Sequence, residues 1–188
     1  MAPAARARAA LAADPQLASG VGFHAMTPAD LDAVLALQRR CYGVGFLERR
    51  EAFAAKLAAT AGLDCCWIAR RDGEPLAYAV SLPACEATLP ALDAPRCERP
   101  AAPTLLYLHD MAVAPEARSL GLAGRLLARL AGRARALGLP RMGLVAVQGS
   151  LPYWQRQGFA EPAALPGALA AKLASFGPEA RFLSASLR

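Results

Sequence analysis

The sequence predicts one α/β domain in which helices flank a central sheet. At 188 residues the chain is long enough to bury a sizeable core within a single domain. Apolar runs typical of strands alternate with segments of helical periodicity, and an Asp72-Gly73 turn joins two such runs as a hairpin. A further apolar run, Leu105 to Val113, leads through Pro115 into a long amphipathic segment. These three observations favour a sheet with helices packed against it.

The first part of the chain predicts a short strand followed by two helices. Residues 22–26 have the pattern of a strand. Thr27 and Pro28 then suit the cap and the first position of a helix. Apolar residues recur at helical spacing over residues 31–42, and a second helix is expected over residues 47–61.

The middle of the chain predicts a hairpin followed by a long loop. Cys65 to Arg70 and Pro75 to Leu82 are the expected strands on either side of the Asp72-Gly73 turn. Residues 83–103 contain five prolines and show no periodicity. Loops of this length within compact domains are usually functional or disordered.

The last part of the chain predicts three more strands and two more helices. The helix that follows the turn after Val113 should end near Gly138, because Pro140 lies just beyond it. The remaining expected elements are a strand over 105–113, a strand over 141–147, a short helix over 151–157 and a final strand over 181–187.

The charge of the chain is basic, with 21 Lys and Arg against 15 Asp and Glu, a formal balance of +6. Much of the excess lies within residues 116–141, where Arg125, Arg129 and Arg133 recur every four residues as on a solvated helix face. A basic stripe suits either nucleic acid or a polyanionic cofactor. No motif of the common nucleic-acid-binding modules is present, so we expect no nucleic-acid partner.

Composition also bears on membranes, metals and location. Alanine accounts for most of the apolar residues, and no uncharged run of about 18 strongly apolar residues occurs, so no membrane association is expected. Five cysteines without a C-x-x-C pair and only two histidines predict no metal site and reduced thiols in a cytoplasmic protein. Residues 1–20 are Ala-rich and lack the apolar core of a secretory signal. We expect them to form a flexible tail, with one domain over residues 21–188.

The segment Arg118 to Gly124 is the most informative motif. It joins the strand that ends at Val113 to the amphipathic helix, and backbone N–H groups at such a helix start have no intrahelical partners. These groups and the helix dipole favour an anion, above all a phosphate. Gly121 allows a close approach of the backbone, and Arg118 adds a positive charge with a planar guanidinium. The segment therefore predicts a phosphate site.

Two motifs together resemble those of the GNAT superfamily of N-acetyltransferases. Arg118-x-x-Gly121-x-Ala123 after Met-Ala-Val-Ala-Pro resembles the acetyl-CoA loop of this family, and the segment from Tyr153 to Phe159 resembles its aromatic-aromatic-x-x-x-Gly-Phe segment. The order of the predicted elements agrees as well, so the resemblance extends over residues 22–188. It implies an α+β fold, with a mixed, mostly antiparallel central sheet flanked by helices and splayed where acetyl-CoA enters.

The resemblance also implies how acetyl-CoA binds. Backbone groups of Met111, Ala112 and Val113 would bind the pantetheine arm. The diphosphate would be held by the following turn, which consists of Arg118, Ser119, Leu120, Gly121, Leu122, Ala123 and Gly124.

His109 and Asp110 are the candidates for the catalytic base. They are polar residues within an otherwise apolar strand, and buried polar groups need partners or a function. Regular alternation would place them on opposite faces of the sheet, with His109 on the face of Tyr107, Met111 and Val113. In the family an acid or base often lies on this strand, and either residue could serve.

The second motif departs from the family at one position. Where many relatives have a tyrosine that protonates the leaving thiolate, this chain has Trp154, which has no comparable proton to donate. Tyr153, one residue earlier, is either a displaced acid or a wall of the CoA channel.

The acceptor is expected between the first two helices, where Tyr42 and Glu48 are candidate substrate-binding residues; a surface role for Glu48 is the alternative. The implied reaction is transfer of acetyl from acetyl-CoA, the co-substrate, to a primary amine of a small molecule or peptide. A homodimer is compatible with this prediction. The rival interpretation is a non-catalytic acyl-CoA-binding or regulatory module on the same fold.

Overall fold

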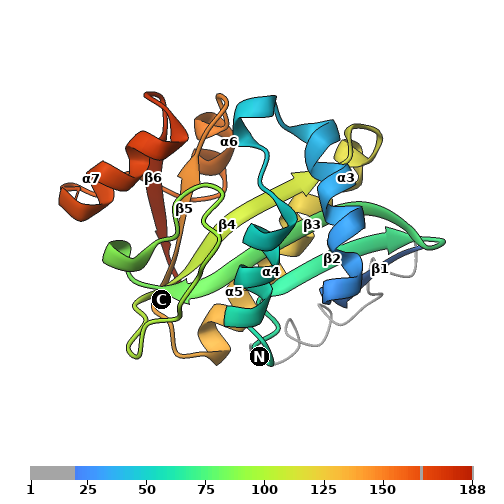
Figure 1. Cartoon of the computed structure of the whole chain (residues 1–188), viewed down its shortest axis with the longest axis horizontal. Coiled ribbons are helices and arrows are strands. Elements are labelled where there is room, and N and C mark those ends of the chain that lie inside the picture. The colour runs from blue at the N-terminus through green and yellow to red at the C-terminus, as the bar shows by residue number, and fades with distance from the viewer. Residues whose placement is uncertain (1–19, 166, 188) are drawn as a thin grey trace, which may run out of the picture.

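Six strands form a single sheet in which they follow one another in chain order (Figure 1). The computed structural model describes residues 20–165 and 167–187, so the tail predicted over residues 1–20 lies outside the described residues except for Gly20. The strands are β1 (Val21–Ala25), β2 (Cys66–Arg71), β3 (Glu74–Ala84), β4 (Leu105–Val113), β5 (Arg141–Ala146) and β6 (Arg181–Ser186).

All neighbouring strands are antiparallel except β4 and β5, which are parallel. The β4–β5 pairing extends only from Leu106 opposite Met142 to Leu108 opposite Leu144. Beyond these residues the two strands continue without pairing, so the sheet is split along the second half of β4. This arrangement confirms the predicted mixed, mostly antiparallel sheet.

Helices cover both faces of the sheet. On one side lie α3 (Leu31–Cys41) and α4 (Arg50–Ala59), and on the other lies α5 (Leu122–Ala136) (Figure 1). Phe53 of α4 packs edge-on against Tyr78 of β3, with ring centroids 6.1 Å apart. Arg125 of α5 lies over the ring of Phe23. Phe23 pairs with Ala69, which pairs with Ala77, so these residues share one face of the sheet. Tyr78 follows Ala77 in the strand and points to the opposite face, so α4 and α5 cover different faces.

Two shorter helices complete the domain. The predicted helix near residue 151 is α6 (Leu151–Arg156), whereas α7 (Gly167–Leu173) was not predicted. Leu169 of α7 is buried against Leu82, Tyr107 and Phe182, in a second apolar cluster beside the main core. None of the helices within the described ranges is long and apolar enough to cross a membrane.

A β-bulge interrupts β4 and determines on which face of the sheet the side chains of His109 and Asp110 lie. Val80 of β3 pairs with Asp110 and Ser81 pairs with Leu108, so His109 is an extra residue between them. His109 contacts Glu48 before α4, and Asp110 contacts Tyr42 at the end of α3. Both side chains therefore lie on the side of α3 and α4. The expectation of opposite faces is wrong, because it assumed unbroken alternation.

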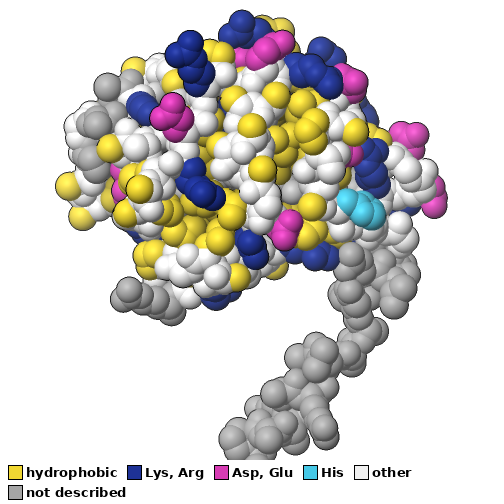
Figure 2. All heavy atoms as spheres, turned by 60° about the horizontal axis from the view of Figure 1, so that its bottom comes forward, with side chains coloured by type: hydrophobic (Ala, Val, Ile, Leu, Met, Phe, Trp, Pro, Cys, Tyr) yellow, Lys and Arg dark blue, Asp and Glu magenta, His cyan; other side chains and the backbone are white. Residues whose placement is uncertain are grey.

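Basic side chains do not form a continuous patch on the face shown in Figure 2, where acidic and apolar groups lie between them. Part of the arginine stripe of α5 packs against the sheet. The guanidinium groups of Arg125 and Arg129 lie 4.5 and 4.7 Å from the centroid of the Phe23 ring, and Arg129 also lies 5.3 Å from that of Trp67. These contacts are cation–π packing across β1 and β2.

Candidate active site

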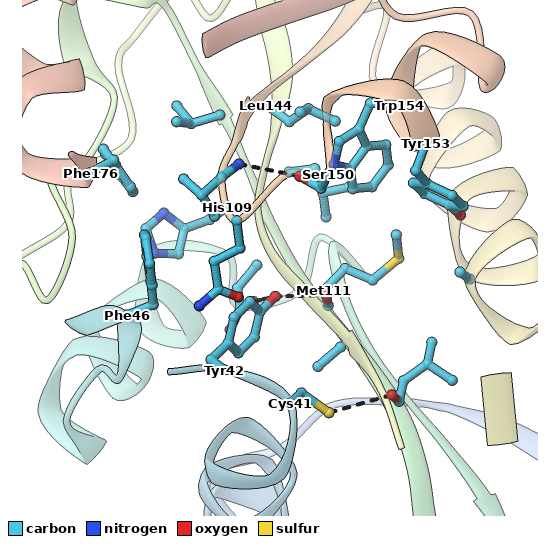
Figure 3. Close-up of a pocket in the computed structure, with 18 of the residues that line it drawn as sticks. Cys41, Tyr42, Phe46, His109, Met111, Leu144, Ser150, Tyr153, Trp154 and Phe176 are labelled. Carbon is cyan, nitrogen blue, oxygen red and sulfur yellow. Dashed lines mark hydrogen bonds between the residues drawn. The ribbon is translucent and has the colours of Figure 1, made fainter. Parts of the chain in front are cut away.

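A cavity of about 280 Å³ lies where β4 and β5 separate (Figure 3). Its walls come from β4, the ends of β5 and α3, the start of α5, and α6. They include Tyr42, Glu48, His109, Asp110, Met111, Ala112, Val113, Arg118, Ala123 and Tyr153, all of which the sequence analysis selected. Residues far apart in the sequence thus meet at the split in the sheet.

The turn before α5 has the geometry expected of an anion site. Gly121 has φ 67° and ψ 17°, a left-handed conformation that favours glycine, and α5 begins immediately after it. Arg125 N–H donates to the Gly121 carbonyl oxygen, so the N–H groups of the preceding residues, 122–124, lie before the first helical hydrogen bond. Arg118 and Ala123 line the cavity.

The other residues that the sequence analysis selected in this turn do not line the cavity. Leu122 is fully buried in the core, so only its backbone is available to a ligand. The other three, Ser119, Leu120 and Gly124, are not part of the cavity wall, and neither is Gly121.

Asp110 is held by two tyrosines. Tyr42 Oη donates to Asp110 Oδ1 at 2.6 Å, and Tyr78 Oη donates to Oδ2 at 2.6 Å. Tyr42 also contacts the carbonyl oxygen of Met111 at 2.8 Å (Figure 3). Burial raises the pKa of Asp110, although the tyrosine hydroxyls oppose the shift. Both carboxylate oxygens therefore have structural partners that tie β4 to α3 and β3.

Glu48 is the centre of a second buried network. Its Oε1 lies 2.7 Å from His109 Nε2, and its Oε2 accepts from Lys56 Nζ at 2.8 Å and from the backbone N–H of Asp93 at 2.7 Å. The side chains of Lys56 and His109 are completely buried, and that of Glu48 is 2% exposed. A carboxylate, an ammonium and an imidazole are thus enclosed together.

The charge of Glu48 determines the tautomer of His109. Burial alone would raise the pKa of Glu48, but its contacts with His109 and Lys56 lower it to about 2. An ionised carboxylate only accepts hydrogen bonds, so His109 Nε2 carries the proton in this contact. In the neutral imidazole Nδ1 is then an acceptor, and it is buried without a hydrogen-bond partner among the described residues.

Three supporting residues were missed by the sequence analysis. Gln38 exchanges two hydrogen bonds with the backbone of Glu48, at 3.0 and 2.7 Å, and so fixes the position of that residue. Lys56 and Asp93 supply the donors described above. Only Lys56 had a signal in the sequence, because it lies on the helix face of Ala52, Phe53 and Thr60, where a lysine is unexpected.

Glu48 should make the folded protein sensitive to acid. Its pKa is lowered from 4.5 to about 2, so its stabilising effect is complete above about pH 4.5 and is lost as the pH falls toward 2. The expected contribution to the slope of the unfolding free energy is up to about 1.4 kcal/mol per pH unit. Denaturant titrations between about pH 5 and pH 3 should show a shallower slope for Glu48→Gln. Glu51→Gln, an exposed carboxyl on α4, should keep the parental slope; equal slopes in all three proteins would contradict the assignment.

The two aromatic residues of α6 have different environments. Trp154 is 9% exposed and packs edge-on against Phe159, with ring centroids 5.6 Å apart, so it belongs to the core while one side of it lines the cavity. Tyr153 is half-buried and lines the cavity on the side opposite His109 (Figure 3). Burial raises the pKa of Tyr153, so its hydroxyl carries a proton at neutral pH.

Comparison with known proteins agrees with this architecture. The sequence model of the acetyltransferase (GNAT) family matches residues 31–159. No curated protein sequence matches the chain. Among solved structures, the GNAT-like decarboxylase GphF in complex with isobutyryl-CoA is similar with a TM-score of 0.69 and 18% identity, over 89% of this chain and 100% of that one.

Two further structures are similar at comparable identity. N-acetylglutamate synthase from Neisseria gonorrhoeae, complexed with coenzyme A and N-acetyl-glutamate, has a TM-score of 0.68 and 22% identity, over 89% of this chain and 35% of that one. The ribosomal-protein-S18-alanine N-acetyltransferase from Escherichia coli has a TM-score of 0.62 and 14% identity, over 89% and 94%. At these identities the structures establish the fold, and the family match covers more than half of the sequence. The chain belongs to the acetyltransferase (GNAT) family.

Proposed function

We propose that the protein transfers an acetyl group from acetyl-CoA to a primary amine of a small molecule or peptide. One observation carries this proposal: one cavity is lined both by Arg118 of the expected anion site and by His109, whose Nδ1 has no hydrogen-bond partner among the described residues. An amine acetyltransferase needs both features, because the co-substrate carries a diphosphate and the ammonium of the acceptor must lose a proton before attack.

The residues around the split in the sheet suit acetyl-CoA. Arg118 and the first N–H groups of α5 would hold the diphosphate, and the backbone of Met111, Ala112 and Val113 would hold the pantetheine arm, where β4 has lost its pairing with β5. The similar structures of GphF and N-acetylglutamate synthase were described with isobutyryl-CoA and coenzyme A. These relatives support an acyl-CoA as co-substrate.

His109 suits the role of base better than Asp110. Both oxygens of Asp110 already accept a tyrosine hydroxyl, whereas His109 Nδ1 has no partner within the part of the chain that the structure describes. Glu48 accepts from Nε2 and would stabilise the imidazolium that forms on proton uptake. Because the imidazole side chain is completely buried, the proposal requires the acceptor or a water molecule to reach Nδ1 when the substrates bind.

In the proposed reaction the ammonium of the acceptor loses its first proton to His109. The amine nitrogen forms a bond to the thioester carbonyl carbon, and a backbone N–H of the Met111–Val113 segment stabilises the oxyanion. The C–S bond then breaks, and the CoA thiolate takes a proton from Tyr153 or from water. The second proton of the nitrogen passes through water to the group that protonated the thiolate. The products are the N-acetylated amine and CoA.

Tyr153→Phe tests the donor of that last proton. The ring and its packing on Trp154 remain, while the hydroxyl is removed. If Tyr153 is the acid, kcat should fall by about 10²-fold and the basic limb of the pH profile should change, with the Kd of acetyl-CoA unchanged. If Tyr153→Phe keeps the parental kcat and the parental pH dependence, Tyr153 is not the proton donor and only lines the CoA channel.

A thiol-release screen tests the proposed function. Acetyl-CoA is incubated with polyamines, amino acids, aminoglycosides, alkylamines and peptide N-termini, and free CoA is measured. Turnover that depends on an amine supports the proposal. Binding of acetyl-CoA without turnover across the panel would instead favour the non-catalytic acyl-CoA-binding module.

A further inference from the structure

We infer that the amine acceptor has an apolar body with no second charge, an inference that rests on the proposed function. The argument concerns the end of the cavity beside His109, opposite Met111 and Tyr153 (Figure 3). Phe46, Leu92 and Phe176 line this end, and we refer to them as the apolar cup. They come from the turn after α3, from the long loop before β4 and from the segment after α7.

The apolar cup is built around the buried network of Glu48. Phe46 precedes Glu48 by two residues, and Leu92 precedes Asp93, whose N–H donates to Glu48 Oε2 at 2.7 Å. Arg49 in turn donates to both Asp93 oxygens, through its backbone N–H at 2.8 Å and its Nε at 2.7 Å. Asp93 itself has a positive φ of 55°, which is uncommon for a residue other than glycine. The loop that contributes Leu92 is therefore fixed to the site.

The charges near the apolar cup are already compensated. Among the described residues of the cavity wall, the carboxylates are Glu48 and Asp110. Glu48 has His109, Lys56 and the Asp93 N–H as partners, and Asp110 has two tyrosine hydroxyls. Arg118 lies at the opposite end of the cavity, by the start of α5. A second ammonium or a carboxylate on the acceptor would thus lose water without gaining a charged partner.

The position of the base assigns this end to the acceptor. With His109 as the base, the amine nitrogen lies near the imidazole, so its substituent extends toward the side chains around that ring. Each methylene buried there favours binding, whereas an unpaired charge buried there opposes it. An alkylamine or arylalkylamine fits this environment, and a diamine or an amino acid does not.

A matched pair of acceptors tests the inference. Hexylamine and 1,5-diaminopentane have the same length. Hexylamine ends in a methyl group at the position where 1,5-diaminopentane has its second ammonium. We expect kcat/KM for hexylamine to exceed that for 1,5-diaminopentane by about 100-fold or more. Leu92→Asp should lower this ratio by about 10-fold or more, because it adds an unpaired carboxylate to the apolar cup. Leu165→Asp, at a residue 39% exposed and outside the cavity wall, is the control that should keep the parental ratio.

The outcomes separate this inference from the proposed function. Equal or better use of 1,5-diaminopentane overturns the inference while leaving amine acetylation intact. Acetyl-CoA binding with no amine acetylated overturns the proposed function itself. If Leu92→Asp alters the preference between acetyl-CoA and hexanoyl-CoA but leaves the amine ratio unchanged, the apolar cup holds the acyl chain, and the inference is wrong.

Discussion

Replacing His109 with Ala is expected to lower kcat by about 10²–10⁴-fold, with little change in the Kd of acetyl-CoA. The reason is the bare Nδ1 of an imidazole whose Nε2 proton is fixed by Glu48. Steady-state kinetics and calorimetry on the same preparations measure the two quantities. Added imidazole should restore part of kcat in this variant, a rescue that a purely structural histidine would not give.

Asp110→Asn is the matched comparison for this prediction. It keeps the shape of the side chain and one acceptor oxygen, so it weakens the contacts with Tyr42 and Tyr78 without removing the base proposed here. We expect lower stability but a kcat within about 10-fold of the parent for the folded enzyme. The reverse pattern, a large loss of kcat in Asp110→Asn and none in His109→Ala, would assign the base to Asp110. Parental activity in both variants would mean that neither residue acts as the base.

Ala123→Glu is expected to weaken the binding of acetyl-CoA by about 100-fold or more relative to Ala123→Gln. Ala123 lines the cavity in the first turn of α5, so the new carboxylate would face the diphosphate. Juxtaposed like charges cost several kcal/mol, and about 2.7 kcal/mol corresponds to 100-fold in Kd.

Ala123→Glu and Ala123→Gln differ only in the charge of the new side chain, so each is the control for the other. Glu and Gln have the same shape and similar helix propensities, and an acidic residue at a helix start favours the helix. A selective loss in the Glu variant therefore reports repulsion rather than unfolding. Equal Kd values for both variants, measured by calorimetry, would place the diphosphate elsewhere.

Local sequence signals predicted most of the fold. The Asp72-Gly73 turn, the strand from Leu105 to Val113 and the start of α5 after Gly121 depend on neighbouring residues, and all three are present in the structure. The α-helix that was missed, α7, is short. Leu169 is the buried apolar residue among those of α7 whose side chains are described, so these residues give no helical periodicity to detect. The family match agrees with the predicted resemblance.

The geometry of the site depends on contacts between elements, which cannot be predicted from the sequence of a single strand. The bulge at His109 arises from the pairing of β4 with β3, so the sequence of β4 alone suggested that His109 and Asp110 diverge. Glu48 was expected either to bind the acceptor or to lie at the surface. Its carboxylate is enclosed by His109, Lys56 and the Asp93 backbone, so the surface alternative is wrong. Partners 8 to 61 residues apart in the chain meet only through the tertiary fold.

The stoichiometry of the reaction tests the central claim most directly. The protein is incubated with deuterated acetyl-CoA and hexylamine, and mass spectrometry measures the labelled amide while a thiol reagent measures free CoA. We expect one N-acetylated amine for each CoA released, with both products reduced together in His109→Ala. Release of CoA without an acetylated amine, or tight binding of acetyl-CoA with no release across the amine panel, would contradict an amine acetyltransferase.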